Sequence, residues 1–116
     1  MKSGCRVFII AGDRELVRGL VVRLDRLGCH VCGQASSAPD VLEQVPAAAP
    51  GIILLDLGLP DAGTIADRLQ RDPAAAPLVL LVSDAGPATR ERIAGIDCRG
   101  CVLGGCTDGE LAVALA

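Results

Sequence analysis

The chain has 116 residues, which is the usual size of one compact domain and too short for two full hydrophobic cores. Hydrophobic residues make up 51% of it and charged residues 22%, so the chain can bury enough apolar surface to fold and is not expected to be disordered. The net charge is -3 and the eleven Lys and Arg residues are scattered, which disfavours direct nucleic-acid binding by this domain. We therefore expect residues 1–116 to form a single domain, with truncation from a longer protein left open.

The first apolar run ends at Ala11 and is too short for a signal-peptide core or a membrane span. A cytoplasmic location without membrane contact is the resulting prediction. Because no secretory segment is seen, the six cysteines are interpreted as thiols rather than as a disulfide framework.

Apolar runs alternate with helical patterns along the chain, and short Gly, Pro, Asp and Ser clusters separate them. Strands are predicted at residues 6–10, 30–34, 51–55, 78–82 and 100–103. Helices are predicted at residues 14–27, 39–45, 63–71, 87–94 and 108–116, with loops at the Ala-Pro clusters 46–50 and 73–77. The strands are continuously apolar, as is typical of a parallel sheet with helices on both faces. The predicted fold class is α/β, with five parallel strands in a doubly wound sheet.

A single carboxylate, Asp56, follows the four aliphatic residues of the third predicted strand. In doubly wound sheets, ligands and chemistry gather at the carboxyl ends of the strands. Asp56 is therefore predicted to lie at a functional site.

Three stretches resemble the receiver domains of response regulators in bacterial two-component systems. They read IILLDLGLPDAG at residues 52–63, VFIIAGDRELVRGLVVRLDRLG at residues 7–28, and the segment from Ala94 to Leu111. The resemblance covers nearly the whole chain and implies a CheY-like, flavodoxin-like (βα)5 fold with its strands in the order 2-1-3-4-5. It also implies that Asp56 stands at the position that accepts a phosphoryl group.

The resemblance also implies a phosphorylation apparatus, and several of its positions are changed here. The family places two acids at the end of the first strand to hold Mg²⁺, where this chain has Ala11 and Gly12. A lysine normally ends the fifth strand, and here Leu103 is followed by Gly104. The ring that the family usually has in that strand is replaced by Cys101.

A hydroxyl after the fourth strand normally turns toward the phosphate in this family. Ser83 is the candidate for this switch hydroxyl, although a shift of one residue would place Val82 there. Two acids could substitute for the missing pair: Asp13, for which helix capping is the favoured role, and Asp84. Asp61 is interpreted as a solvated turn residue.

The remaining polar motifs carry weaker hypotheses. Two C-x-x-C pairs, at residues 29–32 and 98–101, have zinc-like spacing, but the predicted strand order places them at opposite edges of the sheet, which argues against a metal site. Cys5 and Cys29 are expected at the amino ends of adjacent strands and are interpreted as reduced. Cys101 or Cys106 could act as a thiol sensor, which is the least favoured hypothesis.

The first hypothesis is an atypical, non-enzymatic receiver domain that works without phosphorylation as a protein-interaction or dimerisation module, with no cofactor. Its expected partners are proteins: an output domain, a cognate kinase or regulator, or a second copy of the chain. The alternative is a working phosphoacceptor at Asp56 with a non-standard Mg²⁺ site that uses Asp13 or Asp84.

Overall fold

The computed structural model describes residues 5–72 and 76–116 of the chain. Its five strands are β1 (Cys5–Ile10), β2 (Cys29–Ala35), β3 (Ile52–Asp56), β4 (Leu78–Val82) and β5 (Gly100–Leu103). They form one parallel sheet in the order β2-β1-β3-β4-β5. The predicted fold class and strand order are therefore confirmed.

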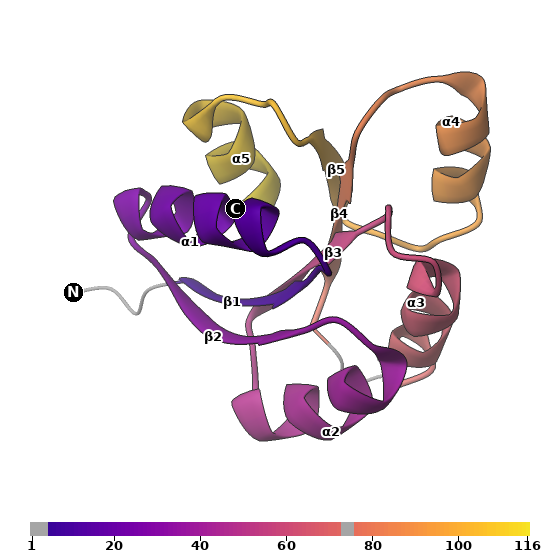
Figure 1. The fold of residues 1–116 in the computed structure, drawn as a ribbon, viewed down its shortest axis with the longest axis horizontal. Helices are drawn as coiled ribbons and strands as arrows, with labels where there is room; N and C mark the ends of the chain where they lie inside the picture. The colour runs from indigo at the N-terminus through magenta and orange to yellow at the C-terminus, as the bar shows by residue number, and fades with distance from the viewer. Residues whose placement is uncertain (1–4, 73–75) are drawn as a thin grey trace.

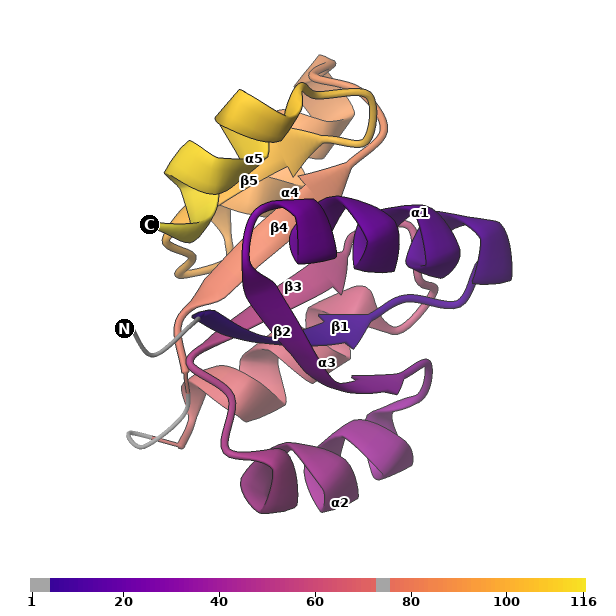
Figure 2. The ribbon, with the colours of Figure 1, turned by 90° about the vertical axis from the view of Figure 1, so that its left-hand side faces the viewer.

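Five helices connect the strands: α1 (Arg14–Arg26), α2 (Ala38–Ala48), α3 (Ala62–Gln70), α4 (Pro87–Ala94) and α5 (Asp108–Leu115). Helices α1 and α5 cover one face of the sheet, and α2 and α3 cover the other, as Figures 1 and 2 show. Helix α4 lies at the β4–β5 side, and none of its residues is buried. It is therefore the most weakly anchored of the described helices.

The two faces of the sheet explain why its central strands are apolar throughout. In β1, Val7 and Ile9 pack with the helices α1 and α5, whereas Phe8 and Ile10 pack with α2 and α3. All four side chains are fully buried. Successive side chains of a strand point to opposite faces, so a strand covered on both faces needs apolar residues at every position.

The prediction of a loop at residues 46–50 was wrong at its start. Helix α2 continues through Pro46 to Ala48 and ends at Ala49, which has a left-handed backbone with φ of 48°. Proline costs the helix one backbone hydrogen bond. That cost is offset by tertiary contacts, because Val45 is buried and the Ala48 carbonyl accepts a hydrogen bond from Arg6 at 2.6 Å.

Of the second predicted loop, residues 73–75 lie outside the described residues, and residues 76 and 77 belong to no helix or strand. The other predicted boundaries differ from the structure by a few residues at most. Among the described helices, none combines the length and the apolar character needed to cross a membrane.

Candidate functional site

Asp56 is the last residue of β3 and is half-buried. Its Oδ1 accepts a hydrogen bond from the Gly58 amide at 2.9 Å, which orders the turn that leads toward α3. The four residues before it are buried, and it pairs in register with Leu81 of β4. The sheet therefore holds this carboxylate at its carboxyl edge, as the sequence predicted.

The end of β1 is apolar where a metal-binding pair of acids would stand. Ala11 is buried, and its amide donates to the Ala35 carbonyl at 3.0 Å. Gly12 is exposed, but a Cβ added to it would lie 3.1 Å from Leu59 Cδ2. Leu59 is itself buried, so a side chain at position 12 would have to displace it by a few tenths of an ångström.

The two acids proposed as substitutes each hold their own loop. Asp13 caps α1, because its Oδ1 accepts from the Glu15 amide at 2.9 Å and from the Leu16 amide at 3.4 Å. The capping role predicted for Asp13 is confirmed. Asp84 Oδ1 accepts from the Gly86 amide at 2.8 Å and from Thr89 Oγ1 at 2.9 Å.

Two hydrogen bonds hold the pKa of Asp84 below its ordinary value. The bond from the Gly86 amide is the larger cause, and the bond from Thr89 is the smaller one. Within residues 5–72 and 76–116 no group of three or more His, Cys, Asp or Glu side chains could hold a metal ion. Mg²⁺ is usually held by one or two carboxylates together with waters and substrate phosphate, and Asp13 and Asp84 at this edge are each hydrogen-bonded within their own loop.

Ser83 and Val82 occupy different environments. Val82 ends β4 with a buried side chain, whereas Ser83 is exposed just beyond the strand. Ser83 lines an open groove of about 1190 Å³ that runs along β5, the β5–α5 loop and α5. The same groove is lined by Cys101, Leu103 and Val113.

Residues of the fifth strand, β5, line this groove. Cys101 is exposed and pairs in register with Leu80 of β4. Gly104 follows the strand, and its amide donates to the Val82 carbonyl at 3.0 Å. No heavy atom lies within 4 Å of a Cβ built at Gly104, so this position has room for a longer side chain.

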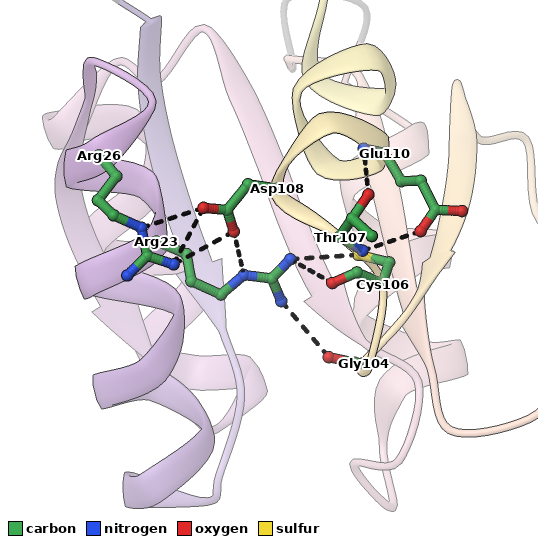
Figure 3. A network of polar contacts seen from close by, with 7 residues as sticks. All are labelled: Arg23, Arg26, Gly104, Cys106, Thr107, Asp108 and Glu110. Carbon is green, nitrogen blue, oxygen red and sulfur yellow. Dashed lines mark hydrogen bonds and ion pairs between the residues drawn. The ribbon is translucent and has the colours of Figure 1, made fainter.

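The loop after β5 is bound by an arginine that the sequence did not single out. Arg23 of α1 donates to the Cys106 carbonyl at 2.6 Å, to Cys106 Sγ at 3.5 Å and to the Gly104 carbonyl at 3.4 Å (Figure 3). It also donates to Asp108 Oδ1 at 2.9 Å. The hydrogen bonds to Cys106 and then to Asp108 raise the pKa of Arg23.

Two further contacts complete this network. Arg26, three residues along α1, donates to Asp108 Oδ2 at 3.0 Å. Thr107 and Glu110 form a capping box, in which Thr107 Oγ1 accepts from the Glu110 amide at 3.1 Å and Glu110 Oε1 accepts from the Thr107 amide at 2.8 Å. Thr107 is the N-cap residue of α5. The Arg23 contact joins residues that are too distant in the sequence to be recognised from it.

The two C-x-x-C pairs lie near opposite edges of the sheet, because β2 and β5 are its outermost strands. The four cysteines therefore lie too far apart to coordinate one metal ion together. The structure holds all six cysteines as thiols.

No protein-family model matches the chain, and no curated protein matches it. Solved structures do. The signal receiver domain of NarL from Mycobacterium tuberculosis has a TM-score of 0.85 at 22% identity, covering 98% of this chain and 94% of that one. The isolated REC domain of RcsB from Salmonella enterica serovar Typhimurium has a TM-score of 0.83 at 19% identity, covering 97% and 86%.

A third similar structure is the signal receiver domain of a modulated diguanylate cyclase from Desulfovibrio desulfuricans G20. It has a TM-score of 0.83 at 22% identity and covers 97% of this chain and 91% of that one. Nearly the whole chain is thus superimposed on each of these receiver domains. The protein has the fold of response-regulator receiver domains.

Proposed function

We propose that this chain is an atypical receiver domain of a response regulator in two-component signalling, which works without phosphorylation as a protein-interaction or dimerisation module. It is a cytoplasmic, non-enzymatic domain in this proposal. The observation that supports it is the contrast at one edge of the sheet: Asp56 ends β3, where the resemblance implies the phosphoacceptor, while Ala11, Gly12 and Gly104 supply neither acid nor lysine.

The chemistry of phosphoryl transfer explains why this contrast matters. An anionic carboxylate attacks an anionic phosphoryl group, so cations must neutralise the charge in the transition state. Losing one such contact typically lowers the rate by ~10²–10³. Three positions are changed here, and the buried, apolar side chain of Leu59 lies beside Gly12.

The surface best suited to a protein partner is the groove between β5 and α5. Leu103 and Val113 stand on this surface with 45% and 78% of their areas exposed. The Arg23 network fixes the loop at one end of the groove, so this surface is ordered before a partner arrives. The proposed partners are an output domain, a cognate kinase or regulator, or a second copy of the chain.

One similar structure favours an output domain as a partner. RcsB from Salmonella enterica serovar Typhimurium is described bound to promoter rprA in the presence of the phosphomimetic BeF3-, and this chain covers 66% of that longer chain. A receiver of this fold can thus be one part of a DNA-contacting protein.

The first experiment asks whether Asp56 accepts phosphate. The protein is incubated with acetyl phosphate and Mg²⁺, and intact mass is measured for wild type, Asp56→Asn and Asp61→Asn, the last being a matched carboxylate in the next turn. We expect no stable phosphoryl adduct on any of the three. An adduct that disappears only in Asp56→Asn would support the working phosphoacceptor and overturn the proposal.

The second experiment concerns the interaction surface. Sedimentation velocity of Val113→Asp is compared with Val22→Asp, a control at an exposed valine of α1 with 55% of its area exposed. Loss of self-association or of output-domain binding in Val113→Asp alone supports the proposed groove. Equal association in both variants contradicts it.

A further inference from the structure

Two cysteines at the amino edge of the sheet stand side by side on adjacent strands. Cys5 begins β1 and Cys29 begins β2, and the two residues are register partners in the parallel pair. This edge is opposite to the one that holds Asp56. The pair is therefore separate from the candidate phosphoacceptor site.

The register of the strand pair sets the Cα atoms of the two cysteines opposite each other. Register partners on neighbouring strands point to the same face, and both residues pack against the cluster beneath α1 that contains Val7 and Leu24. Neighbouring strands lie about 4.7–4.9 Å apart, which falls inside the ~4.4–6.8 Å between Cα atoms that a disulfide spans. Neither side chain is fully buried, so small reagents can reach them.

The other four cysteines lack this arrangement. Cys32 is the residue at which the β1–β2 register shifts, and its thiol donates to the Val7 carbonyl at 3.5 Å. Cys106 contacts Arg23. Burial raises the pKa of the Cys98 thiol, and Cys101 raises it to a smaller extent. All six cysteines lie in the described residues, and only Cys5 and Cys29 are strand-register partners among them.

We propose that Cys5 and Cys29 form a reversible disulfide by exchange with a small-molecule disulfide such as oxidised glutathione. One protein thiolate attacks a sulfur of the reagent, which breaks its S–S bond, forms a mixed disulfide and releases one glutathione thiolate. The second protein thiolate attacks the protein sulfur of that mixed disulfide and displaces the other glutathione thiolate. The two protein thiols lose two electrons and two protons, and the reagent gains them as two thiols.

The bond would join the start of β1 to the start of β2 and enclose α1. It would close a loop of about 24 residues, which restricts the unfolded chain and stabilises the folded one. An increase in Tm of roughly 10 °C is expected from a loop of this length in a domain of this size. Because the bond lies at the far edge of the sheet, the groove along β5 should be unaffected.

The test exposes the full chain to graded ratios of oxidised to reduced glutathione, blocks remaining thiols with N-ethylmaleimide and digests without reduction. Trypsin separates Cys5, in peptide 3–6, from Cys29, in peptide 27–68, which also contains Cys32. A cross-link between these peptides is expected in wild type and in Cys32→Ser, and none in Cys29→Ser or Cys5→Ser. Reversal by dithiothreitol should remove it.

The thermal measurement gives an independent readout. Oxidation should raise Tm in wild type and in Cys32→Ser and leave it unchanged in Cys5→Ser and Cys29→Ser. Three results would overturn the proposal: two separate glutathione adducts without a cross-link, a cross-link that requires Cys32, or a bond between two chains on a non-reducing gel. None of these results bears on the role of Asp56, which the phosphorylation experiment tests alone.

Discussion

Arg23 Nε donates a hydrogen bond of 2.9 Å to Asp108 Oδ1, across 85 positions of the sequence. This contact joins the end of α1 to the start of α5 on one face of the sheet (Figure 3). The same guanidinium also holds the carbonyl of Cys106. One side chain therefore fixes the loop between β5 and α5.

Replacing Arg23 by alanine is expected to destabilise the domain by about 1–3 kcal/mol, because it removes several charge-assisted hydrogen bonds from a largely buried side chain. Arg26→Ala is the matched control, since Arg26 has 56% of its side chain exposed and should cost less. Urea denaturation followed by circular dichroism measures both. Equal losses for the two variants would contradict the special role of Arg23.

The ion pairs of Asp108 should appear in the acid stability of the domain. Hydrogen bonds from Arg23, the larger cause, and from Arg26 hold the pKa of Asp108 below its ordinary value of 3.8. In this pH range the unfolded state binds more protons than the folded state. The ion pairs of Asp108 therefore contribute their full stability above the ordinary pKa, and this stability is lost as the pH falls through the lower pKa of the folded state. Asp108→Asn should lose stability less steeply than wild type at acid pH, measured by urea denaturation at each pH. Parallel curves would refute this assignment.

The packing of Phe8, the one aromatic residue of the chain, predicts a sharp difference between two glycines. A Cβ on Gly33, the register partner of Phe8, would lie 2.5 Å from the ring of Phe8, a fully buried side chain that would have to shift. Gly33→Ala should therefore destabilise the domain by about 1–3 kcal/mol through overpacking. Gly100→Ala in β5 is the control, because no heavy atom lies within 4 Å of its Cβ. Differential scanning calorimetry compares the two, and a neutral Gly33→Ala would show that the ring is not tightly held.

Our proposal attributes the lack of phosphorylation at Asp56 to missing side chains around it. Restoring acids at positions 11 and 12 tests this explanation. Ala11→Asp with Gly12→Asp should bind Mg²⁺ weakly, because Leu59 crowds a side chain at position 12. Adding Leu59→Ala should strengthen Mg²⁺ binding in isothermal titration, since it frees that space. Adding Gly104→Lys should then raise phosphoryl transfer to Asp56 by ~10²-fold or more.

The controls for this reconstruction are wild type and Leu59→Ala alone, which should neither bind Mg²⁺ nor gain an adduct. Mg²⁺ binding that is equally strong with and without Leu59→Ala would refute the crowding argument. If Asp56 stays unphosphorylated in the variant that carries all of these substitutions, the missing acids and lysine do not explain its inactivity.

The parallel sheet and the place of Asp56 could be predicted from the sequence because both depend on local patterns, whereas the order of the strands came from the resemblance to receiver domains. Continuous apolar runs of strand length, separated by helical stripes, indicate a parallel sheet covered on both faces. A carboxylate directly after such a run stands at the carboxyl edge whatever the details of packing. The caps at Asp13 and Thr107 were also predictable, since a capping side chain binds amides only two or three residues away.

The remaining features depended on contacts between distant segments. Pro46 predicts a helix end, yet the burial of Val45 and the contact of Ala48 with Arg6 carry α2 past it. Likewise, Leu59 beside Gly12 and Arg23 beside Asp108 become visible only when the chain is folded. The sequence by itself determined the layered sheet and the position of Asp56, because hydrophobic periodicity and capping act over a few residues. Tertiary structure alone decided what surrounds them, because side-chain contacts between α1, the strand ends and α5 depend on the twist of the whole sheet.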